Sequence, residues 1–124
     1  MMSVEAVQEK LDKLRETLKD ARRLTILAHD NPDPDSISCA VTLAEIVSQV
    51  FGVPASARFN GIIGRAENRE LIRALRLKIR SLSKKEAKSG GPVALVDCQP
   101  GTGNVTLPRN AEVLLVIDHH PLRG

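Results

Sequence analysis

Aromatic residues are scarce in this 124-residue sequence, which has two Phe and neither Trp nor Tyr. Few side chains are therefore available to stack on nucleic-acid bases. The two cysteines, Cys39 and Cys98, form no CxxC pair, which predicts reduced thiols rather than a disulfide framework. No apolar run is long enough to span a bilayer, and no basic-then-apolar leader opens the chain. We therefore expect a cytoplasmic protein without a membrane partner.

Three short aliphatic runs are present, and each ends on ionisable residues. The runs are Leu24–Ala28, Val93–Val96 and Val113–Ile117, followed respectively by His29-Asp30, Asp97 and Asp118-His119-His120. Runs of this kind are typical of buried strands in parallel sheets, and ligands bind outside the carboxyl ends of such strands. The sequence therefore predicts that imidazoles and carboxylates from distant segments meet at one sheet edge, as in a metal site.

The spacing of apolar residues predicts helices between the strands, at Ser3–Asp20, Ser36–Val50 and Glu67–Arg80. Ala55–Phe59 is a weaker strand candidate. Alternation of strands and helices predicts an α/β fold, a three-layer sandwich whose mostly parallel sheet has about four or five strands flanked by helices. We expect one domain, with an amphipathic helix in residues 1–22 and the sheet in residues 23–124. The abrupt stop after the last run suggests the truncated N-terminal catalytic subdomain of a two-domain protein.

The loop after the first run contains three carboxylates and one imidazole within seven residues, His29 to Asp35. A divalent cation would relieve the repulsion between these carboxylates, and this donor set suits Mn²⁺, Zn²⁺ or Fe²⁺ better than Ca²⁺. Asp33 and Asp35 lie in a proline-stiffened segment and can serve neighbouring metals. The alternative is an Asx/Pro turn in which Asp35 or Ser36 caps the next helix.

The other two clusters are consistent with the same chemistry. Asp97 is either a turn former or a carboxylate that bridges two cations. His119 and His120 face opposite ways if they continue a strand, so one can bind metal while the other meets substrate or moves a proton. Asp118 can accept the N–H of a metal-binding imidazole and fix its tautomer.

A basic segment runs from Arg65 to Lys88, with nine Lys or Arg and three Glu. Next to an acidic, cation-seeking cluster it suggests an anionic substrate. At helical spacing, five arginines in and just before the predicted third helix fall within about an 80° arc; they are Arg65, Arg69, Arg73, Arg76 and Arg80. This stripe is a candidate track for phosphodiester or polyphosphate, and a solvated helix face is the alternative.

Taken together, these motifs resemble those of the DHH phosphoesterase family, in particular its RecJ-like exonuclease, oligoribonuclease and exopolyphosphatase-related branch. The matching motifs are His29-x-Asn31-Pro32-Asp33-x-Asp35-Ser36, Asp97 and Asp118-His119-His120. The resemblance implies a hydrolase that cleaves phosphodiester or phosphomonoester bonds of short nucleic acids, nucleotides or polyphosphate. It also implies a two-metal mechanism, with two Mn²⁺ ions in the complete protein and Mg²⁺ or Co²⁺ as alternatives.

The same resemblance assigns roles to individual residues. His29, Asp33 and Asp97 would hold one ion, and Asp35, Asp97 and His119 the other. His120, with Asp118, would act in catalysis by contacting the scissile phosphate or its leaving group. We predict that substrate contacts come from Asn31, Ser36, Arg65 and Arg69.

The sequence departs from the family pattern after His120. The family carries a further metal-binding Asp downstream and a C-terminal substrate-binding domain, and this sequence has neither. A catalytically incomplete fragment that binds metal or nucleotide is therefore the alternative to an active phosphoesterase. The expected partners are a phosphate-ester substrate, including short single-stranded nucleic acid, and a second copy in a homodimer formed at the Val113–Ile117 sheet edge.

Overall fold

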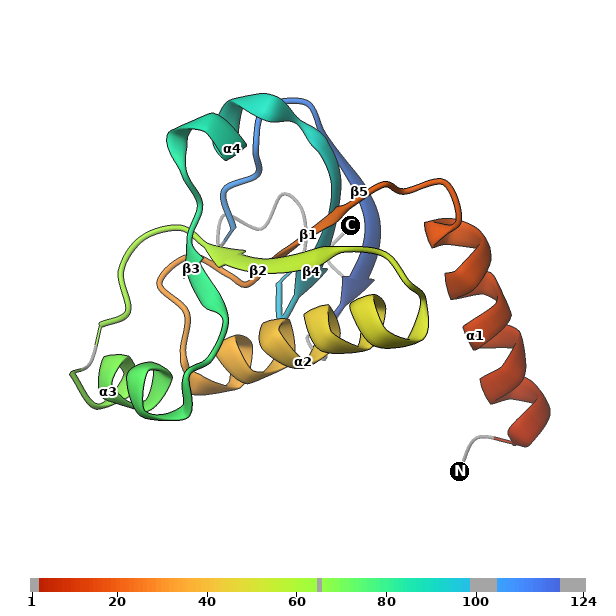
Figure 1. Ribbon diagram of the computed structural model, residues 1–124, viewed down its shortest axis with the longest axis horizontal. Helices are drawn as coiled ribbons and strands as arrows, with labels where there is room; N and C mark the ends of the chain where they lie inside the picture. The colour runs from red at the N-terminus through yellow and green to blue at the C-terminus, as the bar shows by residue number, and fades with distance from the viewer. Residues whose placement is uncertain (1–2, 65, 99–104, 119–124) are drawn as a thin grey trace.

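The computed structural model describes residues 3–64, 66–98 and 105–118. The strands are β1 (Leu24–Leu27), β2 (Ala55–Phe59), β3 (Ile79–Ser81), β4 (Gly91–Val96) and β5 (Ala111–Ile117). The helices are α1 (Val4–Leu18), α2 (Pro34–Val50), α3 (Ala66–Leu75) and α4 (Lys84–Ser89). The five strands form one parallel sheet in the order β3-β2-β1-β4-β5, with α2 and α4 on opposite faces (Figure 1). The predicted α/β class and strand number are confirmed.

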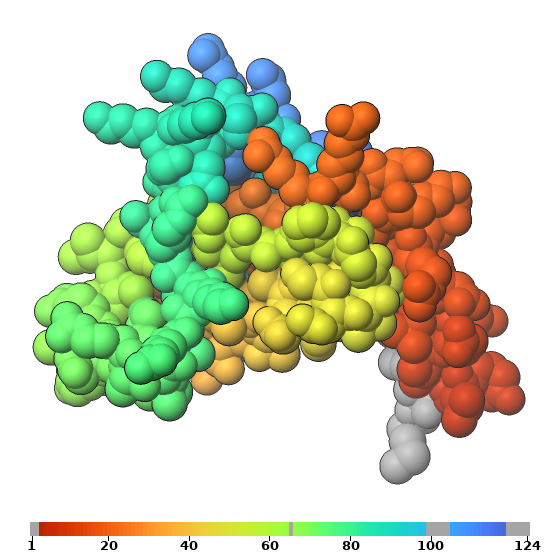
Figure 2. All heavy atoms as spheres, in the orientation of Figure 1, coloured from red at the N-terminus to blue at the C-terminus, as the bar shows by residue number. Residues whose placement is uncertain are grey.

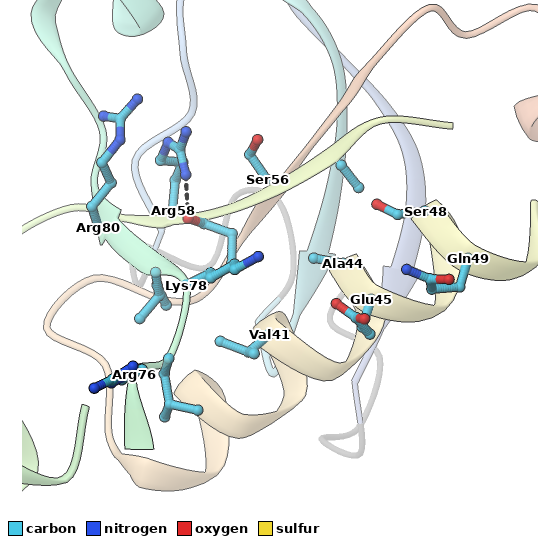
Figure 3. A pocket seen from close by; sticks show the side chains of 14 residues that line it. Val41, Ala44, Glu45, Ser48, Gln49, Ser56, Arg58, Arg76, Lys78 and Arg80 are labelled. Carbon is cyan, nitrogen blue, oxygen red and sulfur yellow. Dashed lines mark hydrogen bonds between the residues drawn. The ribbon is translucent and has the colours of Figure 1, made fainter. Parts of the chain in front are cut away.

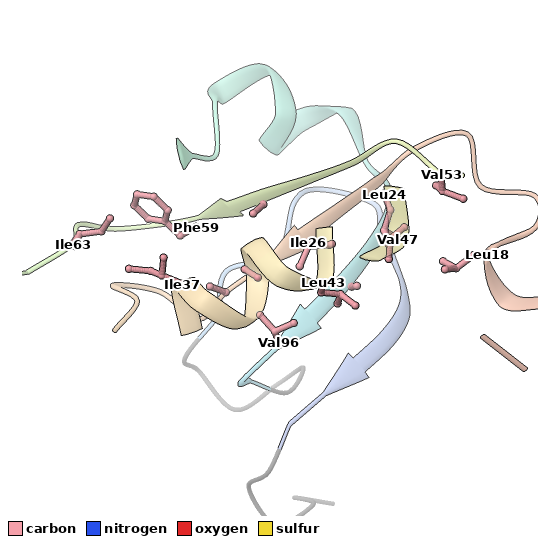
Figure 4. Close-up of a cluster of buried hydrophobic side chains, with 14 residues drawn as sticks. Leu18, Leu24, Ile26, Ile37, Leu43, Val47, Val53, Phe59, Ile63 and Val96 are labelled. Atoms are coloured by element: carbon pink, nitrogen blue, oxygen red, sulfur yellow. The ribbon is translucent and has the colours of Figure 1, made fainter. Parts of the chain in front are cut away.

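The main hydrophobic core lies between α2 and one face of the sheet (Figure 4). Because side chains alternate across a strand, every second residue of the central strands faces α2. Buried members of this core include Ile26, Ala57 and Ala94 from the strands and Ile37, Leu43 and Val47 from α2. This packing fixes α2 against the sheet and so determines where its first turn lies.

A smaller buried cluster occupies the other face of the sheet and consists of Leu27, Val93, Leu95 and Cys98. Burial raises the pKa of the Cys98 thiol to about 12, so the thiol stays protonated at neutral pH. Cys98 therefore behaves as a small buried hydrophobic side chain.

The chain leaves β1 and enters β4 on opposite faces of the sheet. After β1 it crosses to β2 through α2, whereas it reaches β4 from β3 through α4 (Figure 1). The two strands nevertheless pair directly, with Ile26 opposite Ala94. Because the two connections lie on opposite faces of the sheet, a crevice opens between the carboxyl ends of β1 and β4. This crevice is the usual ligand site of open α/β sheets.

The predicted first helix is present as α1, and Ser3 caps it by accepting a hydrogen bond from the Ala6 N–H at 3.1 Å. Leu18 is buried and Leu14 packs against the core, but Val4 is 81% exposed, so α1 packs by its C-terminal part against the rest of the described chain. Figure 2 shows α1 as a projection at one side of the molecule. Within the described ranges, no helix has both the length and the hydrophobicity that a bilayer crossing requires.

The predicted helix over Glu67–Arg80 is wrong at its C-terminal end. α3 stops at Leu75 because Arg76 adopts a left-handed conformation, with φ +53°. The Arg76 N–H donates to the Arg73 carbonyl at 3.2 Å, and the Leu77 N–H donates to the Ile72 carbonyl at 3.0 Å. This is the Schellman pattern, which normally places glycine where Arg76 lies.

The predicted stripe of five arginines along one helix is wrong for the same reason. Arg76 belongs to the turn after α3, and Arg80 belongs to β3. Of the remaining members, Arg69 donates to the Ile63 carbonyl at 2.9 Å, and Arg65 lies outside the described residues. The strand β3 and the short helix α4 were absent from the sequence prediction, since both are short and rich in charged residues.

A small ionic network attaches α4 to the sheet. The carboxylate of Glu86 accepts hydrogen bonds from Arg58 at 3.0 Å and from Arg80 at 2.9 Å, and it completes a capping box with Ser83. Burial alone would raise the pKa of Glu86, but the Ser83 N–H and the Arg58 guanidinium favour the charged form and lower this pKa to about 2. The charged form of Glu86 therefore stabilises the folded state.

We expect Glu86→Gln to lower the free energy of unfolding at pH 7 by about 1–2 kcal/mol. Because the folded-state pKa lies below the unfolded value of 4.5, this contribution is complete above about pH 5 and is lost as the pH falls towards 2. Urea denaturation of both proteins across this range should show the difference shrinking with acidity. Glu16→Gln on the exposed surface of α1 is the control, and an equal effect there would contradict the assignment.

Candidate metal centre

His29 and Asp97 meet at the crevice between β1 and β4. His29 lies two residues beyond the end of β1, and Asp97 directly follows β4. The His29 Nε2 atom lies 3.7 Å from Asp97 Oδ2 and 3.8 Å from Asp33 Oδ2. One ligand atom from each of these three side chains lies within 4.8 Å of the other two. The predicted convergence of the first two clusters is therefore present.

The orientation of the His29 ring suits metal binding. Its Nδ1 atom lies 2.9 Å from the Asp30 carbonyl oxygen. Because a carbonyl only accepts hydrogen bonds, the ring hydrogen belongs on Nδ1, which leaves the lone pair of Nε2 directed at the two carboxylates. Metal-binding histidines commonly have such a fixed tautomer.

Asp33 acts as the N-cap of α2 and also faces His29. Its Oδ1 accepts a hydrogen bond from the Ser36 N–H at 2.9 Å, while its Oδ2 is the oxygen near His29. The Ser36 N–H lowers the pKa of Asp33, so this carboxyl group remains ionised as a metal ligand must. The expectation that Asp35 or Ser36 caps the helix is wrong, because Asp33 takes that position.

Ser36 is fully buried and fixes the third ligand. Its hydroxyl donates to Asp97 Oδ2 at 2.7 Å, across 61 positions of sequence. Asp97 itself has φ +57°, a left-handed conformation that Asp tolerates better than most residues. Its backbone N–H donates to the Ile117 carbonyl at 2.8 Å, so β5 also anchors it. In this structure the Ser36 hydroxyl is therefore engaged with Asp97. A contact between Ser36 and substrate stays a prediction.

Asp35 lies in the exposed first turn of α2 and is not part of this three-residue cluster. Asp118 follows β5 and is half-buried. The predicted ligand His119 and the predicted catalytic residue His120 lie outside the described residues. The proposed second metal set, made of Asp35, Asp97 and His119, therefore stays a prediction.

Asn31, a predicted substrate contact, ties the His29 loop to the loop after β2. Its Oδ1 accepts from the Ile62 N–H at 2.8 Å, and its own N–H donates to the Asn60 carbonyl at 2.9 Å. A Cβ atom at Gly61 would lie 2.0 Å from Asn31 Oδ1, and Gly61 has φ +83°. Glycine is therefore required at this close approach.

Asp30 is a site residue to which the sequence motifs assign no role. Its carboxylate accepts from the Thr106 N–H at 3.0 Å and from the Thr106 hydroxyl at 2.6 Å. Its backbone carbonyl accepts from His29, so Thr106 acts on the imidazole through Asp30. The Thr106 carbonyl also accepts from Asn60 at 2.9 Å, which joins three loops around the cluster. No local sequence signal could have found a contact across 76 positions.

The cluster fits a divalent cation by its donor chemistry. An imidazole nitrogen and two carboxylate oxygens converge, and the separations of 3.7 and 3.8 Å are too long for direct hydrogen bonds but suit ligands that share one ion. An open parallel sheet with a carboxylate–imidazole cluster at its switch point is the arrangement of a metal-binding α/β domain.

Comparison with known proteins identifies the class more closely. The model of the DHH family, N-terminal domain, matches residues 23–124, and the chain belongs to this family of metal-dependent phosphoesterases. The chain is similar to the uncharacterized protein MJ1633 of Methanocaldococcus jannaschii, with 31% identity over 112 residues. That match covers 90% of this chain but only 22% of the relative's length. No solved structure matches the chain.

We expect Asp97→Asn to weaken Mn²⁺ binding at least tenfold, because it removes a charged ligand while keeping the side-chain shape. Isothermal titration calorimetry of the full 124-residue chain measures this effect. Glu45→Gln, on an exposed turn of α2, has the same chemical change and should leave Mn²⁺ affinity unaltered. Equal affinities in both variants and the parent chain would contradict the cluster as a metal centre.

We expect Thr106→Val to weaken Mn²⁺ binding by on the order of tenfold, because Asp30 then loses one of its two anchors and His29 loses its fixed orientation. Thr106→Ser keeps the hydroxyl and should restore the parent affinity. The chemical shifts of the His29 ring give a second readout of its tautomer. Unchanged shifts and affinity in Thr106→Val would show that Asp30 needs no support from Thr106.

Proposed function

We propose that this chain is the catalytic subdomain of a phosphoesterase that hydrolyses phosphodiester or phosphomonoester bonds by a two-metal mechanism. The substrates would be short nucleic acids, nucleotides or polyphosphate. The cluster of His29, Asp33 and Asp97 at the strand-end crevice carries this proposal, together with membership of the family. The chain spans 22% of the length of the relative that it matches. Any activity of a longer protein that contains this chain is therefore also a proposal.

Each residue has a distinct task in the proposed reaction. His29, Asp33 and Asp97 would hold one cation, and Asp35, Asp97 and His119 would hold the second. Divalent cations at this position supply activation of water and neutralise charge on the phosphoryl oxygens. We infer that Mn²⁺ is the physiological ion, with Mg²⁺ or Co²⁺ as substitutes, since the donors are imidazole and carboxylate.

The remaining groups bind and orient the phosphate ester. The N-terminus of α2 points its partial positive charge towards the crevice, which favours an anionic phosphoryl group there. His120 would contact the scissile phosphate or protonate the leaving group, and Asp118 would hold the neighbouring imidazole in its tautomer. Asn31, Ser36, Arg65 and Arg69 would complete the substrate contacts.

A catalytically incomplete module that binds metal or nucleotide is the second candidate. It is favoured by the three-ligand cluster, which accounts for one cation among the described residues rather than two.

A homodimer through the outer edge of β5 is a further proposal, supported by the exposure of Val116 and Ile117 on that edge strand. A cytoplasmic location is the setting we propose for either function.

We expect the full chain to hydrolyse a generic aryl phosphodiester, a dinucleotide or pAp when Mn²⁺ is added, and Asp97→Asn to reduce kcat/KM at least 100-fold. Glu45→Gln is the matched control and should retain parent activity. Initial rates with Mn²⁺, Co²⁺ and Mg²⁺ rank the ions. Mn²⁺ binding without turnover on any of these substrates would contradict catalysis by this chain and support the binding module.

A further inference from the structure

Among the described residues, Ser36 is the one polar side chain that is completely buried. A buried hydroxyl destabilises a protein unless it forms hydrogen bonds, so its partner indicates why it is present. A serine in a helix often bonds to a nearby backbone group of its own segment. The Ser36 hydroxyl instead donates to Asp97 Oδ2 at 2.7 Å, across 61 positions of sequence. Its partner is therefore a candidate metal ligand rather than its own helix.

Ser36 also engages the other carboxylate of the cluster, through its backbone. The Ser36 N–H donates to Asp33 Oδ1 at 2.9 Å. This leaves Asp33 Oδ2 as the oxygen that lies 3.8 Å from His29 Nε2. On Asp97, the hydroxyl uses part of the accepting capacity of Oδ2, the oxygen that lies 3.7 Å from the same nitrogen. One residue thus determines how both carboxylates face the imidazole.

These two hydrogen bonds limit how many oxygens each carboxylate can offer to one cation. Because Asp33 Oδ1 is engaged by the Ser36 N–H, Asp33 offers the cation Oδ2 alone. The last side-chain torsion of an aspartate is soft, so the Asp97 carboxylate would turn readily without a restraint. The Ser36 hydroxyl supplies this restraint. The cluster therefore presents one imidazole nitrogen and one oxygen from each of two fixed carboxylates.

A fixed donor set of this kind discriminates between cations. Ca²⁺ takes about six to eight oxygen ligands, commonly including carboxylates that bind through both oxygens, and it tolerates flexible geometry. Mn²⁺ is compatible with a mixed set of imidazole and carboxylate donors. A restrained Asp97 carboxylate therefore favours Mn²⁺, whereas a carboxylate that can turn would offer Ca²⁺ a further oxygen.

We propose that Ser36 is a positioning residue that makes the cluster of His29, Asp33 and Asp97 selective for Mn²⁺ over Ca²⁺. The inference rests on the proposed function, because it concerns the cation of the same centre. The Ser36 hydroxyl has a single hydrogen, so it cannot donate to a substrate oxygen while it donates to Asp97. Ser36 therefore acts on the cation through Asp97, and this action needs no substrate.

The test measures the dissociation constants of Mn²⁺ and Ca²⁺ for the full chain by isothermal titration calorimetry without substrate. Mn²⁺ titrations at increasing Ca²⁺ concentration give the second constant. We expect Ser36→Ala to weaken Mn²⁺ binding on the order of tenfold, because Asp97 loses the donor that orients it. Ca²⁺ binding should stay within about twofold of the parent value, so selectivity for Mn²⁺ should fall at least about fivefold.

Ser48→Ala is the matched control, since it removes the same hydroxyl group from the same helix. Ser48 lines a groove between α2 and the β2–β3 side of the sheet (Figure 3). It lies about 18 Å from Ser36 along the helix axis. Both affinities should therefore stay at the parent values in Ser48→Ala. Urea denaturation of the two variants compares their stability with that of the parent chain.

The ratio of the two affinities separates positioning from a merely structural role. A general loosening of the fold in Ser36→Ala would weaken both cations by the same factor and leave the ratio unchanged. An unchanged ratio, or an equal fall of the ratio in Ser48→Ala, would overturn the proposal. Either result leaves the proposed function standing, since the parent chain still binds Mn²⁺. The proposed function fails instead if the Mn²⁺-loaded parent chain does not hydrolyse the aryl phosphodiester, whatever its selectivity.

Discussion

Direct parallel pairing of β1 with β4 brings His29 Nε2 to 3.7 Å from Asp97 Oδ2, although the two residues are 68 positions apart in sequence. The pairing itself depends on buried aliphatic side chains that gain their stability from exclusion of water, on the order of 1.5–3 kcal/mol each. The polar residues at the strand ends contribute little to that core. They are held at the crevice because the core fixes both strand ends, and the chemistry of the site depends on this adjacency.

The electrostatic cost of gathering carboxylates at one point is met in several ways. The first turn of α2 donates a backbone N–H to Asp33, and the Ser36 hydroxyl donates to Asp97. The Ser36 N–H lowers the pKa of Asp33, and the helix N-terminus adds a field that favours anions. The first turn of α2 therefore caps its own helix through Asp33 and holds Asp97 through Ser36, while Asp33 Oδ2 and Asp97 Oδ2 both lie near the His29 imidazole. A cation shared by these groups would remove the repulsion that is left.

The sequence supports the prediction of the sheet well, because strand runs such as Val93–Val96 are continuous, aliphatic and end abruptly on Asp97. It also indicates that His29 and Asp97 meet, because both follow parallel strands that end at one edge, whereas the resemblance to the family adds Asp33 to them. It could not indicate β3 or α4, whose residues are few and mostly polar. Nor could it show that Arg76 would end α3, since the helical spacing continues through that residue and only tertiary packing selects the left-handed turn.

The contact between Asp30 and Thr106 illustrates the limit of local patterns. A single Asp next to His29 is consistent with loop charge, and only the fold brings Thr106 against it. Such long-range contacts decide how precisely a ligand is held, because a ring that rotates freely loses much of its value as a metal ligand. Motifs thus identify the atoms that can bind a cation. The loops joined by Asn31, Asp30 and Thr106 determine whether those atoms are preorganised.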